Sequence, residues 1–97
     1  MMDVLVLIDI INQDNKELFE KHLKKEGFKT VENEAYVYTA ESTTTTFATK
    51  SYILEVFKKG LLKTTFDQCQ LVFLLNETPY PTYVFDKTNN DFEISEK

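Results

Sequence analysis

The stretch Asp3-Val4-Leu5-Val6-Leu7-Ile8-Asp9-Ile10-Ile11 decides the fold, because it is an almost unbroken aliphatic and β-branched run. An open-faced strand alternates apolar with polar residues, whereas a run of this kind predicts a strand buried on both faces. Asp9 interrupts the pattern near the far end of the run. A carboxylate in that position indicates either a functional site or a local structural role.

The composition predicts one domain over residues 1–97, since a chain of 97 residues has room for one core. No apolar run approaches the roughly 18 residues that span a bilayer. The amino-terminal run lacks the basic flank and cleavage site of a signal peptide, so a soluble, cytoplasmic protein is expected. The net charge of −5 opposes non-specific attraction to nucleic acid phosphates.

A first helix is expected directly after this strand. Asp14 and Glu17 have the spacing of an acidic capping box at a helix start. Gly27 offers a left-handed closing residue after the lysines that suit a helix carboxyl end. The apolar side of this helix comprises Leu18, Phe19, His22 and Leu23.

Two strands and a second helix are expected in the middle of the chain. Residues 28–39 alternate with a period of two, which predicts a strand. The threonine-rich residues 42–47 favour an edge strand, with a backward extension of the next helix as the other interpretation. Helical spacing of apolar residues predicts the second helix over about Ser51–Lys59, and Gly60 is placed to end it.

The remaining segments complete an order of βαββαβ with extra carboxyl-terminal strands. Residues 68–75 are the second strongly apolar strand, and residues 83–85 and 91–94 are expected to pair across a polar turn. This order predicts an α+β, ferredoxin-like sandwich, with two helices on one face of an antiparallel sheet. The tail from about residue 87 is expected to form a loose hairpin arm.

The first strand is apolar on both of its faces, whereas the two helices of the predicted fold cover only one face of the sheet. An exposed apolar face of several hundred Å² is unusual on a monomer, so the sequence predicts a homodimer through the sheet face. The competing interpretation is that the carboxyl-terminal segment folds back over this face with its aromatic residues Tyr80, Tyr83, Phe85 and Phe92.

Asp9 is the leading candidate for chemistry. Near a two-fold axis, two copies of Asp9 could share a hard divalent cation such as Mg²⁺. The structural interpretation, in which Asp9 caps loop amides or pairs with a lysine, has equal support.

Other reactive side chains favour structural interpretations. His22 lies on or beside the apolar stripe of the first helix, where packing is the commoner role. Cys69 is alone and adjoins an apolar run, which predicts a buried thiol. Tyr36 and Tyr38 are of the type that stacks on bases from a sheet face, yet a role in the core or an interface is favoured.

Several segments together resemble a known family. Residues 4–10, the helix ending at residues 23–28 and the strand residues 35–38 are similar to the small CRISPR-associated nuclease family and to the virulence-associated protein D ribonucleases. The resemblance implies ferredoxin-like homodimers whose first strand ends in a metal-associated aspartate, and it would place Asp9 at that position.

Two functions follow as expectations. The first is a small homodimeric interaction or regulatory module without catalysis or cofactor, with a protein as its partner. The alternative is a metal-dependent nuclease in which Asp9 is the catalytic residue and metal ligand, with Mg²⁺ as cofactor and nucleic acid as substrate.

Overall fold

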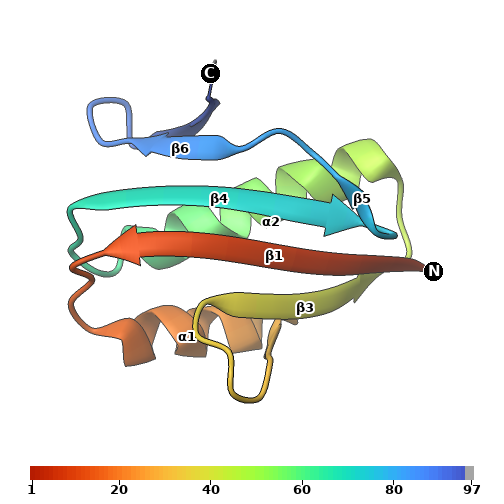
Figure 1. Cartoon of the computed structure of the whole chain (residues 1–97), viewed down its shortest axis with the longest axis horizontal. Helices are drawn as coiled ribbons and strands as arrows, with labels where there is room; N and C mark the ends of the chain where they lie inside the picture. The colour runs from red at the N-terminus through yellow and green to blue at the C-terminus, as the bar shows by residue number, and fades with distance from the viewer. Residues whose placement is uncertain (96–97) are drawn as a thin grey trace.

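Strand β1 (Met2–Ile11) lies at the centre of a seven-stranded antiparallel sheet. A computed structural model describes residues 1–95 of the chain. β1 pairs with β3 on one side and with β4 on the other, and the sheet has the order β2-β3-β1-β4-β6-β7, with β5 paired to β4 (Figure 1). The architecture is therefore α+β, as the sequence predicts.

The other elements follow β1 in the order in which the chain runs. Their bounds are α1 (Lys16–Lys25), β2 (Lys29–Thr30), β3 (Val37–Ser42), α2 (Thr46–Leu61), β4 (Gln68–Leu75), β5 (Thr78–Pro79), β6 (Tyr83–Asp86) and β7 (Asp91–Ile94). Neither helix of the described residues is long and apolar enough to cross a membrane.

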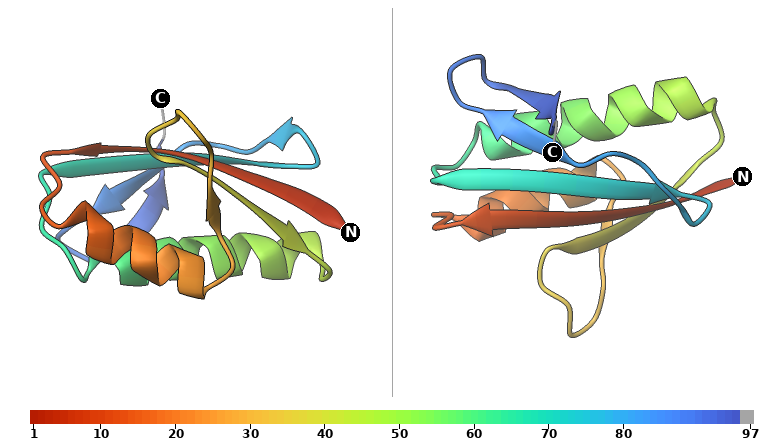
Figure 2. Two further views of the ribbon diagram at one scale, coloured as in Figure 1. Left: turned by 90° about the horizontal axis from the view of Figure 1, so that it is seen from below. Right: turned by 45° about the horizontal axis from the view of Figure 1, so that its top comes forward.

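Both helices pack against the same face of the sheet (Figure 2). Side chains alternate across a strand, and the even-numbered residues of β1 from Val4 to Ile10 point toward the helices and are buried. The odd-numbered residues point the other way, where no helix or strand of residues 1–95 covers them. Burial of β1 on both faces is therefore wrong for the isolated chain.

The core between sheet and helices is rich in aromatic rings. Phe19 of α1, Phe57 of α2 and Tyr38 of β3 are fully buried and meet edge to face, with centroid separations of 5.8–6.2 Å. Edge-to-face pairs of this kind add stabilisation beyond the area they bury. They fix both helices to the helix-side face of the sheet.

Helix α1 ends as expected and begins differently. Gly27 has a φ of 100°, and the N–H groups of Gly27 and Phe28 donate to the carbonyls of Lys24 and Leu23. This pair of bonds is a Schellman motif, so the predicted closing role of Gly27 is confirmed. The predicted capping box is wrong, because Asn15 is the N-cap and Asp14 instead forms a backbone bridge with Thr65.

The predicted strand over residues 28–39 is wrong, because the segment is divided. Residues 31–36 leave the sheet between β2 and β3, with positive φ at Asn33 and Tyr36. The hairpin partner of β2 is then β3, which runs on to Ser42. Residues 42–47 consequently do not form the expected edge strand.

Helix α2 is longer than the spacing of its apolar residues indicates. Thr45 caps it, since its hydroxyl accepts a hydrogen bond from the N–H of Ala48 at 3.1 Å. The helix passes through Gly60 and ends after Leu61, so the prediction that Gly60 ends it is wrong. The interpretation in which the threonine run extends this helix backward is confirmed from Thr46 onward.

The carboxyl-terminal hairpin extends the sheet beyond β4. Tyr83, Phe85 and Phe92 are buried on the helix side, and Phe85 contacts Phe66 at a centroid distance of 5.5 Å. Tyr80 also lies on that side, where its ring stacks on Phe73. The interpretation in which these aromatics cover the other face of the sheet is therefore wrong.

Candidate functional site

The face of the sheet opposite the helices, here called the open face, carries an aliphatic stripe. The pairing register places Leu5 opposite Leu74 and Leu7 between Val37 and Val72. We call these five residues the aliphatic stripe. Leu7 is 38% exposed, and the other four are partly exposed. A contiguous group of aliphatic side chains on the surface is typical of an interaction site.

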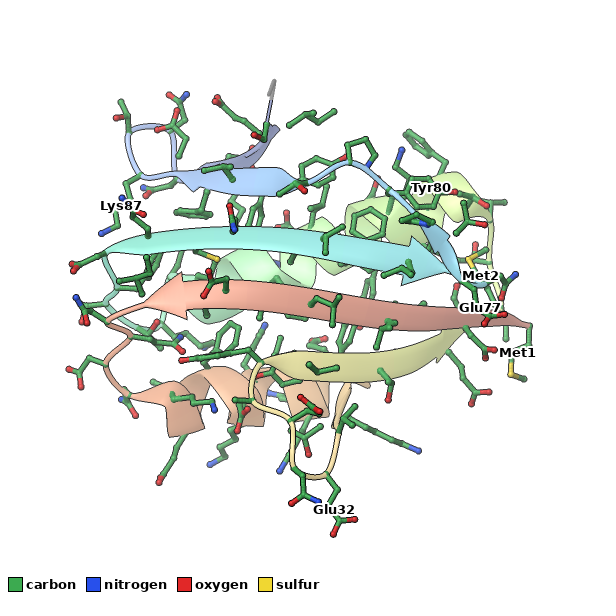
Figure 3. All side chains as sticks on the ribbon, viewed as in Figure 1. Met1, Met2, Glu32, Glu77, Tyr80 and Lys87 are labelled. Atoms are coloured by element: carbon green, nitrogen blue, oxygen red, sulfur yellow. The ribbon has the colours of Figure 1, made fainter. Side chains whose placement is uncertain are left out.

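Carboxylates lie at one end of the aliphatic stripe. Asp3 of β1 is directly opposite Glu41 of β3, and Glu77 follows β4 at the same end of the molecule (Figure 3). Like charges that face each other across two strands destabilise a sheet. With Leu5, Leu74 and their neighbours, these groups line a groove of about 890 Å³. Among the residues that the structure describes, Lys29 is the one lysine on its wall.

Asp9 lies at the other end of the aliphatic stripe. It is exposed on the open face, two residues before the end of β1 and directly opposite Gln70 of β4. Leu7 and Ile11 flank it along the same face of the strand, and Ile11 is 45% exposed. The three ion pairs found in residues 1–95 do not include Asp9, so the interpretation in which it pairs with a lysine finds no support.

The predicted metal role of Asp9 rests on one carboxylate in each chain. Within residues 1–95, no group of three or more His, Cys, Asp or Glu side chains is placed to hold a metal ion. A shared site would therefore depend on a second copy of Asp9 or on oxygens from a ligand. This role stays a prediction.

His22 has a packing position between the helices. Its ring approaches α2 at Gly60, where a Cβ atom would lie 3.3 Å from His22 Cδ2. Its Nε2 is buried and has no hydrogen-bond partner among the described residues. This position favours the packing interpretation of His22.

Tyr36 and Tyr38 are engaged within the protein. The Tyr38 hydroxyl donates to Glu20 Oε2 at 2.7 Å, and burial together with this carboxylate raises the pKa of Tyr38. The Tyr36 hydroxyl donates to Gln13 Oε1 at 2.9 Å, while Lys16 Nζ lies 4.3 Å from the centroid of its ring. A core role is thus confirmed for Tyr38, and Tyr36 packs against the same core.

Cys69 is a buried thiol, as predicted. It is 2% exposed on the helix side of β4. Burial, with a smaller effect from the Asp9 carboxylate, raises the pKa of its thiol to about 12. A thiol of this kind is protonated at neutral pH and is a poor nucleophile.

The groove and its acidic end are not predicted from the sequence. Asp3 and Glu41 are 38 positions apart, and only the register of β1 against β3 brings them together. The predicted strands over residues 28–39 and 42–47 both leave Glu41 out, so the sequence carries no visible signal of this juxtaposition.

No protein-family model matches the chain, and neither the curated proteins nor the solved structures contain a match to it.

Proposed function

We propose that this protein is a small, non-catalytic interaction module that associates through the open face of its sheet. In the absence of another partner, the occupant of that face is a second copy of the chain, giving a homodimer. The proposed setting is the cytoplasm.

The fold that we propose for this module is a ferredoxin-like sandwich. The order β2-β3-β1-β4, with α1 after β1 and α2 after β3, supports this assignment. The hairpin of β6 and β7 is then an addition at the β4 side of the sheet. Such a sandwich leaves one face of its sheet for association.

One observation carries the proposal, namely the exposure of aliphatic side chains on a sheet whose other face is packed against the two helices. Leu7 and Val84 are 38% and 39% exposed on the open face. Burying apolar surface contributes about 25 cal/mol per Å², so covering this face stabilises any complex that buries it. Catalysis does not require such a surface, whereas association does.

The second candidate is the metal-dependent nuclease, with Asp9 as its carboxylate ligand and Mg²⁺ as cofactor. It is supported by the position of Asp9, which is exposed near the end of the first strand. The resembled families carry a metal-associated aspartate at that point. Phosphodiester hydrolysis would be the reaction.

Cleavage assays separate the two functions. Purified protein is incubated with single- and double-stranded RNA and DNA, with and without Mg²⁺, beside the variants Asp9→Asn and Asp3→Asn. Asp3 lies on the same strand and face as Asp9 and serves as the matched control. We expect no cleavage above the protein-free blank. Mg²⁺-dependent cleavage that persists in Asp3→Asn and disappears in Asp9→Asn would establish the nuclease instead.

A further inference from the structure

The charges of the molecule are divided between its two layers. The helices α1 and α2 together carry seven lysines and three glutamates. Among residues 1–95, the hollows of the open face are lined by one lysine, Lys29, and by five carboxylates, which belong to Asp3, Asp9, Glu41, Asp67 and Glu77. The aliphatic stripe is therefore surrounded by acidic groups.

This distribution of charge affects a second copy of the chain and a basic partner differently when either binds the open face. A second copy packed face to face brings carboxylates toward carboxylates, with Lys29 as the one lysine among residues 1–95 that lines the groove. A partner with lysine or arginine around an apolar centre meets an opposite charge at both ends of the aliphatic stripe. Complementary charge speeds encounter and fixes orientation. The open face thus favours a basic partner over a second copy.

The dimensions of the aliphatic stripe indicate the shape of that partner. Neighbouring strands lie about 4.8 Å apart, so the stripe on β3, β1 and β4 is about 10 Å wide, close to the diameter of an α-helix. Asp9 lies six positions after Asp3 along the extended strand, which corresponds to about 20 Å. A helix of about 14 residues covers that length.

We infer that the open face binds a basic amphipathic helix of a partner protein, which lies along the aliphatic stripe with its cationic side chains near Asp3, Glu41 and Asp9. The inference rests on the proposed function, because it names the partner of the same surface. It also specifies competition, since the helix and a second copy cannot occupy the open face together. A helix on this face would form the third layer of the sandwich.

Three labelled peptides of about 14 residues test the inference by fluorescence anisotropy. The first has leucines along one helical face and lysines elsewhere, and the second replaces every lysine with glutamate. The third has the composition of the first in a shuffled order that disperses the leucines. We expect the first peptide to bind at least about tenfold more tightly than either of the others. It alone combines a continuous leucine face with positive charge.

Salt distinguishes the two occupants of the open face. Raising the salt from about 50 mM to about 300 mM screens attraction and repulsion alike. Binding of the lysine peptide should weaken at least about threefold, whereas the homodimer should become tighter. Opposite responses to salt are therefore expected in the two measurements.

Two matched double variants show which carboxylates contribute to binding of the lysine peptide. Asp3→Asn/Glu41→Gln removes two charges from the open face, and Glu32→Gln/Glu34→Gln removes two from the turn between β2 and β3 (Figure 3). We expect the first variant to bind the lysine peptide about three- to tenfold more weakly, and the second to stay within about twofold of the wild type. Circular dichroism melts confirm that both variants are folded.

The outcomes separate the inference from the proposed function. Equal binding of the lysine and glutamate peptides, or equal losses in the two double variants, overturns the basic helix as partner. A stable dimer that binds no peptide also overturns it, while the proposed homodimer stands. Cleavage that depends on Asp9 overturns the proposed function itself.

Discussion

Neighbouring residues on one strand of this protein have opposite chemical surroundings. On β4, Cys69 faces the core and Gln70 faces the open side beside Asp9. The strand period of two places them on different faces of the sheet, and the helices then bury one face alone. Reactivity at a residue therefore follows from the face on which it lies.

Cys69 should react very slowly in the folded protein. Its thiol pKa is raised from 9.0 to about 12, which lowers the thiolate fraction at neutral pH about a thousandfold. Mass spectrometry of iodoacetamide labelling at about pH 8 measures this, with the chain in concentrated guanidinium as control. Labelling of the native protein as fast as of the unfolded chain would contradict the burial of this thiol.

The same raised pKa predicts how stability depends on alkaline pH. The unfolded chain ionises Cys69 near pH 9.0, whereas the folded chain holds its proton up to about pH 12. The contribution of this thiol is fully present below pH 9.0 and is lost as the pH rises toward about 12. Loss of stability that begins well below that range would have another origin.

At the scale of elements, the close approach of α1 to α2 depends on Gly60. A Cβ atom at this position would lie 3.0 Å from Phe19 Cδ1 and 3.3 Å from His22 Cδ2. Phe19 is fully buried against Phe57 and Tyr38, so its ring has little room to move. Gly60 therefore allows α1 to approach α2 closely, and it does not end the helix.

Gly60→Ala should destabilise the fold despite the better helix propensity of alanine. Overpacking costs about 1–3 kcal/mol, and the propensity gain offsets about 1 kcal/mol of it. Urea unfolding measures the difference, with Ser51→Ala at an exposed position of α2 as the control that gains propensity without contact. A Gly60→Ala protein more stable than the wild type would show that the helices readily separate here.

For the whole molecule, the division into a covered and an open face predicts conditional self-association. The aliphatic stripe favours a dimer, and the carboxylates around it oppose one. Repulsion between exposed charges is screened by salt, so association should strengthen as ionic strength rises. The helix layer, which carries most of the lysines, is outside this contact.

Sedimentation should show a mass that rises above 11.4 kDa with concentration, and Leu7→Ser should lower it. Leu18→Ser is the matched control, because Leu7 and Leu18 are 38% and 39% exposed on opposite layers of the molecule. Replacing one interface leucine should weaken the dimer about tenfold or more. A monomer at high micromolar concentration, or equal masses for both variants, would contradict the homodimer.

The sequence predicts a conformation correctly where neighbouring residues alone form it. Gly27 followed by Phe28 closes α1 in a Schellman motif, which involves only neighbouring residues. Residues 31–36 are different, because the turn there requires positive φ at Asn33 and Tyr36. Those conformations are stabilised by long-range contacts, such as the hydrogen bond from Ile8 N to Tyr36 O.

The sequence by itself determined that β1 is a central strand, since an aliphatic run of that length has no stable place at a solvated edge. It also determined that a carboxylate, Asp9, interrupts the aliphatic run near its far end. Only the tertiary structure decided which side of β1 is covered, because both sides are apolar and the packing of α1 and α2 selects one. The other side stays open in the single chain, and we propose that a partner with basic side chains covers it.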